Sequence, residues 1–281
     1  MSDESAVGGS SDTRDFRWVL DVSPVVAVMT LLVGTYLLPT SVQRELVFDY
    51  STPTVLTAYT APFVHFSASH LVSNLAAFVL VAGTIYSLSV GAERRRVFFM
   101  LGATLLIAFP VSLSVLNLAV PREGITYGFS GMNMALVGFL PVVIATYVER
   151  RLGYLVDGVL LLVAFFLSAG YIAAIAVPWT TYSAVIAVTA AVLALGFVLQ
   201  YVVSIRDCLE PIQTLVEWCG GAKTIVVVGI GIWGALLWIG FPESVADDGA
   251  VINIYVHFIG YALGFITAYL AYEWQLIGER P

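Results

Sequence analysis

Long runs of apolar residues dominate this chain and restrict what it can fold into. The segments Val22 to Thr40, Val97 to Val120 and Ile252 to Tyr272 contain no Asp, Glu, Lys or Arg. Each is long enough to cross a hydrocarbon core about 30 Å thick, which takes roughly 20 helical residues. Only 11% of the 281 residues are charged, against about a quarter in soluble domains. The sequence therefore predicts an integral membrane protein.

Windowed hydropathy predicts eight transmembrane helices, because a helix satisfies all its backbone groups within lipid. The fold class is thus all-α, a polytopic transmembrane helical bundle formed by residues 21–281. Residues 1–20 are polar and are predicted to be a disordered cytoplasmic tail. No small-residue cleavage site follows the first apolar segment, so we expect that helix to be retained. The expected spans are 22–41, 68–90, 97–119, 129–148, 153–177, 180–204, 224–241 and 251–273.

The distribution of positive charge predicts the orientation. With the N-terminus inside, ten of the 12 Lys and Arg residues fall in cytoplasmic segments, and only Arg44 and Arg122 fall outside. This bias fits the positive-inside rule and an even number of spans, with both termini in the cytoplasm. The net charge of −7 argues against nucleic acid as a partner. Cys208 and Cys219 share one predicted cytoplasmic loop, so no structural disulfide is expected.

All three histidines occur at or just inside the outer ends of predicted spans. His65 and His70 flank the start of the second span, and Asn74 follows four residues after His70. Residues four apart share one helix face, so His70 and Asn74 point into the same space. Polar side chains at such depths are costly and usually paired or functional.

A serine between glycines opens the fourth predicted span, in the sequence Gly128-Phe-Ser130-Gly131. Glycines let the backbone turn tightly and let another group approach the hydroxyl closely, as a nucleophile requires. The motif is not the nucleophile elbow of soluble hydrolases, which would have glycine at Met132.

The eighth predicted span carries His257 one turn before Gly260, with Gly264 one turn further. Two glycines one turn apart form a flat strip on which a neighbouring helix can pack closely. We expect the helix with Ser130 to pack there, which would bring the imidazole within reach of the hydroxyl. The spans with Ser130, His257 and His70 all run inward from the outer face, so these groups share one depth in the outer leaflet.

Other interpretations of these residues stay open at this point. A serine in a membrane helix often bonds its own backbone, and a histidine near an interface is often half solvated. Three imidazoles can also hold a catalytic zinc ion, which would leave the serine motif unexplained. The remaining polar groups in or near spans are interpreted as packing or interface residues: Asn117, Asn133, Asp157 and Asn253.

Together these motifs resemble the rhomboid family of intramembrane serine proteases. Residues 65–74 look like the family's His-x-x-x-x-His-x-x-x-Asn motif, 128–131 like its Gly-x-Ser-Gly, and 257–264 like its His-x-x-Gly-x-x-x-Gly. The three occur in the family's order, and the paired-histidine pattern is the most specific.

The resemblance implies a Ser-His dyad with Ser130 as nucleophile and His257 as general base. It further implies that His70 and Asn74 help form the oxyanion hole, that His65 organises the loop and its water, and that no metal or other cofactor takes part. The expected activity is cleavage of membrane-protein substrates in or next to their transmembrane segments, toward the outer face of the cell membrane. An inactive relative that binds transmembrane clients is the alternative.

The chain departs from the family pattern in two ways. The family core has six spans with one between the serine and histidine helices, whereas three are predicted here. An extra helical hairpin is therefore expected within 153–241, and the sequence leaves open which span is the core fifth helix. The first outer loop, 41–67, lacks the family's Trp-Arg pair. The tyrosine expected one turn after the serine is Met134, which leaves the imidazole's stacking partner open.

Overall fold

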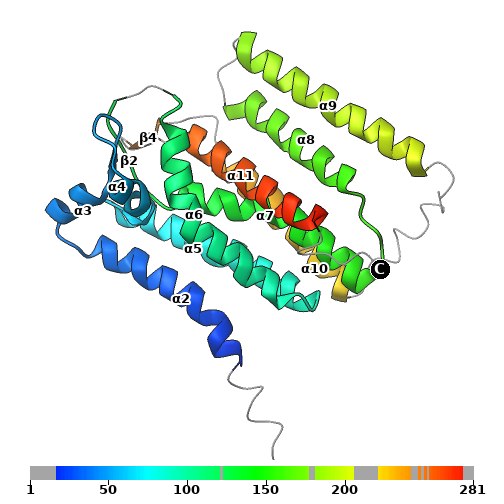
Figure 1. Ribbon diagram of the computed structural model, residues 1–281, viewed down its shortest axis with the longest axis horizontal. Coiled ribbons are helices and arrows are strands. Elements are labelled where there is room, and N and C mark those ends of the chain that lie inside the picture. The colour runs from blue at the N-terminus through cyan, green and yellow to red at the C-terminus, as the bar shows by residue number, and fades with distance from the viewer. Residues whose placement is uncertain are drawn as a thin grey trace, which may run out of the picture.

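The computed structural model is a helical bundle (Figure 1). It describes residues 17–120, 123–176, 181–205, 221–241, 246–247, 250–251 and 253–274. A long helix coincides with each predicted span: α2 (Arg17–Tyr36), α5 (Ala68–Gly91), α6 (Arg95–Asn117), α7 (Ser130–Tyr147), α8 (Gly158–Ala176), α9 (Thr181–Ile205), α10 (Gly221–Gly240) and α11 (Ile254–Glu273). Within the described ranges, α5, α6, α10, α11 and the helical run that begins with α7 are long and apolar enough to cross a membrane.

The predicted N-terminal tail is corrected at its end. Because α2 begins at Arg17, residues 17–20 are helical and not part of a disordered tail. Residues 1–16 and both cysteines lie outside the described residues.

Helix α7 lies at the centre of the bundle. Nearly all its side chains are buried, and α5, α6, α10 and α11 pack around it. Its closest partner is α11. Membrane helices associate largely through close packing of small residues, and α7 and α11 both carry glycines at their contact.

Helices α8 and α9 form a hairpin beside this bundle (Figure 1). Ala190 and Ala194 of α9 are buried in this hairpin, and the rings of Phe166 and Phe197 stack 5.8 Å apart across it. Helix α8 also packs against α11, whereas α10 packs against α7 and α5. Of the three helices between the serine and the histidine, α10 therefore packs most extensively against the bundle.

The segment between α2 and α5 folds over one end of the bundle. It contains α3 (Thr40–Leu46), β1 (Phe48–Asp49), α4 (Val55–Thr60) and a 3-10 turn, η1 (Ala61–Phe63). Strand β1 pairs antiparallel with β2 (Ile125–Thr126), which precedes α7. A second short pair, β3 (Ala246–Asp247) with β4 (Ala250–Val251), precedes α11.

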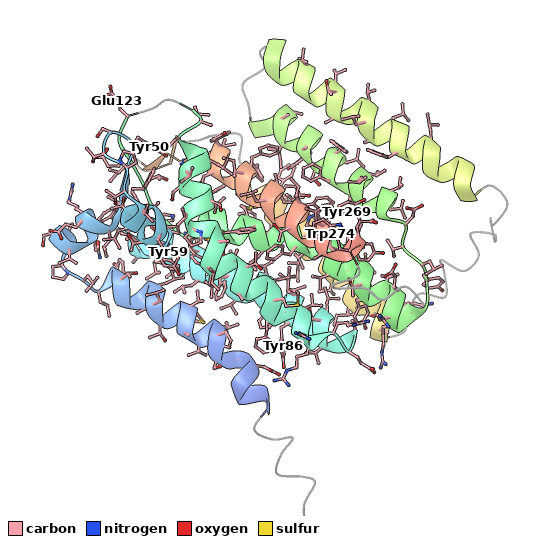
Figure 2. The ribbon with its side chains drawn as sticks, viewed as in Figure 1. Tyr50, Tyr59, Tyr86, Glu123, Tyr269 and Trp274 are labelled. Carbon is pink, nitrogen blue, oxygen red and sulfur yellow. The ribbon has the colours of Figure 1, made fainter. Side chains whose placement is uncertain are left out.

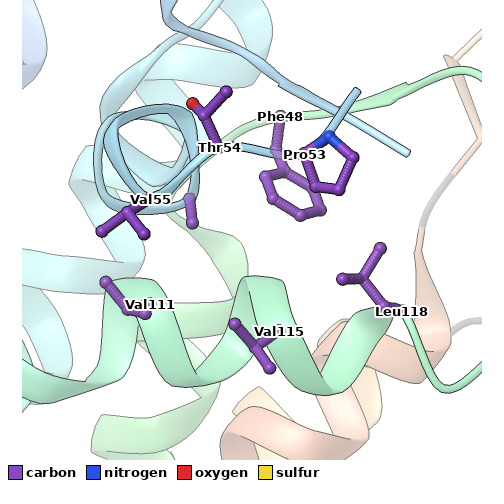
Figure 3. Close-up of a pocket in the computed structure, with 8 residues that line it drawn as sticks. Phe48, Pro53, Thr54, Val55, Val111, Val115 and Leu118 are labelled. Carbon is purple, nitrogen blue, oxygen red and sulfur yellow. The ribbon is translucent and has the colours of Figure 1, made fainter. Parts of the chain in front are cut away.

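An apolar pocket of about 160 Å³ lies between α4 and α6 (Figure 3). Phe48, Val55, Val111 and Leu118 are among its lining residues. Neither Ser130 nor any histidine lines it.

An ion pair between buried Asp21 and partly exposed Arg95 ties α2 to α5 and α6 at the opposite end of the bundle. Asp21 accepts a hydrogen bond from the Tyr86 hydroxyl at 2.8 Å and one from Arg95 Nε at 2.6 Å, and it also pairs with Arg95 Nη2. Figure 2 shows Tyr86 at this end and Tyr50 at the other.

Candidate active site

Helix α7 begins at Ser130 because the chain turns sharply just before it. Gly128 has φ +102°, a conformation that side chains other than glycine rarely adopt. A Cβ atom there would lie 2.6 Å from Cε1 of His70. Gly128 is therefore required both for the turn and for the approach of the imidazole. The Ser130 side chain is half-buried, and α7 has no side-chain N-cap.

His65 holds the residue before the serine. Its imidazole is fully buried, and its Nε2 atom accepts a hydrogen bond from the Phe129 N–H at 3.4 Å. Burial first, then the neighbouring His70, lower the pKa of His65 to about 4, against a smaller opposite effect of the Phe63 carbonyl. His65 is therefore neutral at neutral pH, as a hydrogen-bond acceptor must be.

His70 and Asn74 lie on one face of α5, as predicted from their spacing. The His70 ring is half-buried, 4.8 Å from the ring of His65. Asn74 is buried, and its Nδ2 atom donates to the carbonyl oxygen of His70 at 2.9 Å. One amide hydrogen of Asn74 is thus used within its own helix.

Asn133 connects α7 to α5, a role that the sequence did not reveal. Its Nδ2 atom donates to the backbone oxygen of Asn74 at 3.0 Å and to Asn74 Oδ1 at 3.2 Å. From the sequence alone, Asn133 is interpreted only as a packing or interface residue. Its spacing of three residues from Ser130, which puts both on one helix face, was the available indication.

Helices α7 and α11 touch backbone to backbone. A Cβ atom on Gly260 would overlap the carbonyl oxygen of Gly131, and one on Gly264 would overlap that of Ala135. The reverse also holds, because a Cβ atom on Gly138 would overlap the backbone of α11. His257 lies one turn before Gly260, so it is held beside the first turn of α7.

The end of α10 orients His257. The imidazole is 8% exposed, and its Nδ1 atom lies 2.8 Å from the carbonyl oxygen of Gly240. A carbonyl can only accept, so Nδ1 carries the hydrogen and Nε2 keeps a free lone pair. Phe241 packs edge-on against the ring, with centroids 6.1 Å apart. Gly240 and Phe241 were not predicted, since nothing in their local sequence distinguishes them.

The site gathers Ser130, His257, His65, His70 and Asn74 at one end of the bundle. In the part of the chain that the structure describes, no hydrogen bond joins the Ser130 hydroxyl to the His257 imidazole. The zinc alternative finds no support in the same residues, where no three His, Cys, Asp or Glu side chains are grouped to hold a metal ion.

No protein-family model, curated protein or solved structure matches this chain.

Proposed function

We propose that this chain is an intramembrane serine endopeptidase that cleaves transmembrane protein substrates in or next to their membrane segments. The observation that carries the proposal is the glycine contact between α7 and α11, which holds His257 beside the turn that begins with Ser130. A serine hydroxyl is a weak nucleophile that needs a base nearby. His257, with Nδ1 bound to Gly240, has the tautomer such a base requires.

The proposed reaction uses the dyad in two halves. Ser130 Oγ attacks the scissile carbonyl carbon while His257 Nε2 takes the hydroxyl proton. The tetrahedral intermediate collapses, the C–N bond breaks, and His257 returns the proton to the leaving amine. Water, deprotonated by the same imidazole, then hydrolyses the acyl ester and restores Ser130. A hydrogen bond absent without substrate can form in the substrate complex, since catalytic bonds often tighten only there.

The start of α7 offers donors for the developing oxyanion. Helix α5 has Ser67 as a side-chain cap and α11 has Asn253, whereas α7 has none. The backbone N–H groups of its first turn, at the positive end of the helix dipole, suit an anion. His70 and the second amide hydrogen of Asn74 would add to them, as the family resemblance implies.

The proposal includes a rhomboid-like arrangement of the helices. In it α2, α5, α6, α7, α10 and α11 correspond to the six core spans, with α10 as the fifth, and α8–α9 is the added hairpin. The packing of α10 against α7 and α5 supports this assignment. The excess of Lys and Arg in one set of loops supports a cell-membrane orientation with both termini in the cytoplasm and the site toward the outer face.

Cleavage of a reporter membrane substrate by purified protein tests the proposal. Ser130→Ala and His257→Ala should each lose activity by about 10³-fold or more. Ser87→Ala is the matched control, because that serine only bonds its own helix at the Gly83 carbonyl. If both dyad variants cut as fast as the parent, the dyad is wrong.

The missing Ser130–His257 hydrogen bond favours one second candidate, an inactive protein that binds transmembrane clients. Labelling with a serine-directed fluorophosphonate separates the two. An adduct that Ser130→Ala abolishes supports the protease, and its absence from correctly folded parent protein supports the client-binding alternative.

A further inference from the structure

Three polar side chains from distant parts of the chain meet beside the candidate active site. The Tyr50 hydroxyl accepts a hydrogen bond from Asn117 Nδ2 at 2.6 Å and one from Asn253 Nδ2 at 3.3 Å. Asn253 Nδ2 also lies 3.4 Å from Asn117 Oδ1. Asn117 is fully buried at the end of α6. Tyr50 follows β1 and lies at the end of the bundle that carries the site (Figure 2).

Asn253 fixes the turn of α11 that carries His257. It is the N-cap, and its Oδ1 atom accepts the Val256 N–H at 3.1 Å. Its backbone oxygen accepts the His257 N–H, also at 3.1 Å. The hydrogen bonds that hold Asn253 therefore help to fix where α11 begins and where its first histidine lies.

The backbone at Tyr50 holds the approach to Ser130. Its N–H donates to the carbonyl oxygen of Gly124 at 3.1 Å. The preceding strand β1 pairs with β2, with Phe48 opposite Thr126. Strand β2 ends four residues before Ser130. Tyr50 thus contacts the segment that leads into the serine through its backbone and the segment that leads into the histidine through its hydroxyl.

We infer that Tyr50 is a positioning residue that couples the two members of the dyad. The inference rests on the proposed function, which it deepens. Tyr50 acts by holding the start of α11 against the loop that carries β1 and β2. Such coupling matters because a displacement of about 1 Å between reacting groups can cost on the order of 100-fold in rate.

Tyr50→Phe tests the role of the hydroxyl with little change of shape. We expect kcat to fall about tenfold while KM stays within about twofold, because orientation and not substrate binding is lost. Tyr59→Phe is the matched control. Tyr59 is in the same outer segment and donates to the Leu106 carbonyl at 3.1 Å, so it ties that segment to α6 and not to α11. Asn117→Ala should reproduce the loss, and the double variant should lose less than the two effects combined.

Amide hydrogen exchange tests the coupling without activity. In a Ser130→Ala background, the amides of Val256 and His257 should exchange about fivefold faster with Tyr50→Phe, and no faster with Tyr59→Phe. Unchanged exchange overturns the inference. The inference is also overturned if Tyr50→Phe speeds exchange in the Ser130→Ala background but leaves kcat unchanged in the active enzyme. The position of α11 would then not affect the dyad. Faster exchange in a protein whose parent never cleaves supports the coupling and overturns the protease function.

Discussion

The Nδ1 atom of His257 lies 2.8 Å from the carbonyl oxygen of Gly240. In soluble serine hydrolases a carboxylate holds this position on the base. Here the Gly240 carbonyl at the end of α10 occupies that position, and Phe241 packs edge-on against the His257 ring. The orientation of the base therefore depends on where α10 ends, which links a helix without reacting groups to the chemistry.

The first prediction concerns the tautomer of His257. Since Gly240 can only accept, neutral His257 should carry its hydrogen on Nδ1 and leave Nε2 unprotonated. Nitrogen NMR of histidine-labelled protein, assigned with His65→Gln and His70→Gln, measures this directly. Observation of a neutral Nε2–H form would exclude His257 as the base in this geometry.

The second prediction concerns the contact between α7 and α11. Gly260→Ala places a methyl group where the Gly131 carbonyl oxygen lies, so the helices must separate. We expect a loss of about 1–3 kcal/mol in the free energy of unfolding, and a loss of proteolysis at temperatures where the variant is folded. Gly231→Ala on α10, where a Cβ meets nothing within 4 Å, should leave both unchanged. Thermal unfolding measures the stability of the two variants, and reporter cleavage measures their activity. If Gly260→Ala were as stable and as active as Gly231→Ala, the proposed contact would be wrong.

The third prediction concerns the link between α7 and α5. Asn133→Leu leaves Asn74 Oδ1 without its donor and should cost about 1–2 kcal/mol. The loss stays modest because the substitution also removes Asn133 Oδ1, which is buried without a hydrogen-bond partner in the described structure and so destabilises the parent protein. Activity should fall by more than the loss of folded protein explains, because Asn133 holds Asn74, whose second amide hydrogen is a proposed oxyanion donor. Thr146→Val is the control, since Thr146 only bonds its own helix at Val142. An active Asn133→Leu enzyme would separate Asn74 from catalysis.

Hydropathy predicted the helices well because each apolar run must be helical if it lies in lipid. The same spans predicted that Ser130 and His257 lie near the beginnings of their helices, and the structure has each residue in the first turn of its helix. The close approach of α7 and α11 was also predictable, since Gly260 and Gly264 lie one turn apart and leave room for a backbone.

The partners of these residues were not predictable in the same way. Gly240 acts through its carbonyl, a group that every residue has, so no residue type marks it. Asn117 and Asn253 were visible as polar groups but lie far apart in sequence, and only the fold brings them to Tyr50. The sequence likewise did not decide which of α8, α9 and α10 packs into the bundle. All three are strongly apolar, so their hydropathy does not show which one is most buried.

The fourth prediction concerns acid. The pKa of His65 is about 4 in the fold against 6.5 for the free side chain. Above pH 6.5 His65 is neutral in both the folded and the unfolded state, so its lowered pKa does not reduce stability there. As the pH falls from 6.5 toward 4, the unfolded state binds the proton first, and the free energy of unfolding falls by about 3 kcal/mol at most. Thermal unfolding between pH 7 and 4 should therefore show a flatter pH dependence for His65→Gln than for the parent. Parallel curves would show that His65 does not resist protonation.

The fifth prediction concerns the end of the bundle away from the site. Asp21→Asn removes the charge that Arg95 and Tyr86 share. Asp21 is buried, but the Arg95 side chain is 36% exposed and can turn to water, so we expect a loss of about 1–3 kcal/mol and not the larger cost of a fully buried pair. Tyr86→Phe keeps the ion pair and should lose only about 1 kcal/mol. Reporter cleavage per folded molecule should be unchanged in both, since α2 meets α5 here at the end opposite to Ser130. A loss of activity without a loss of stability would instead mean that this pair communicates with the site through α5, which carries both Tyr86 and His70.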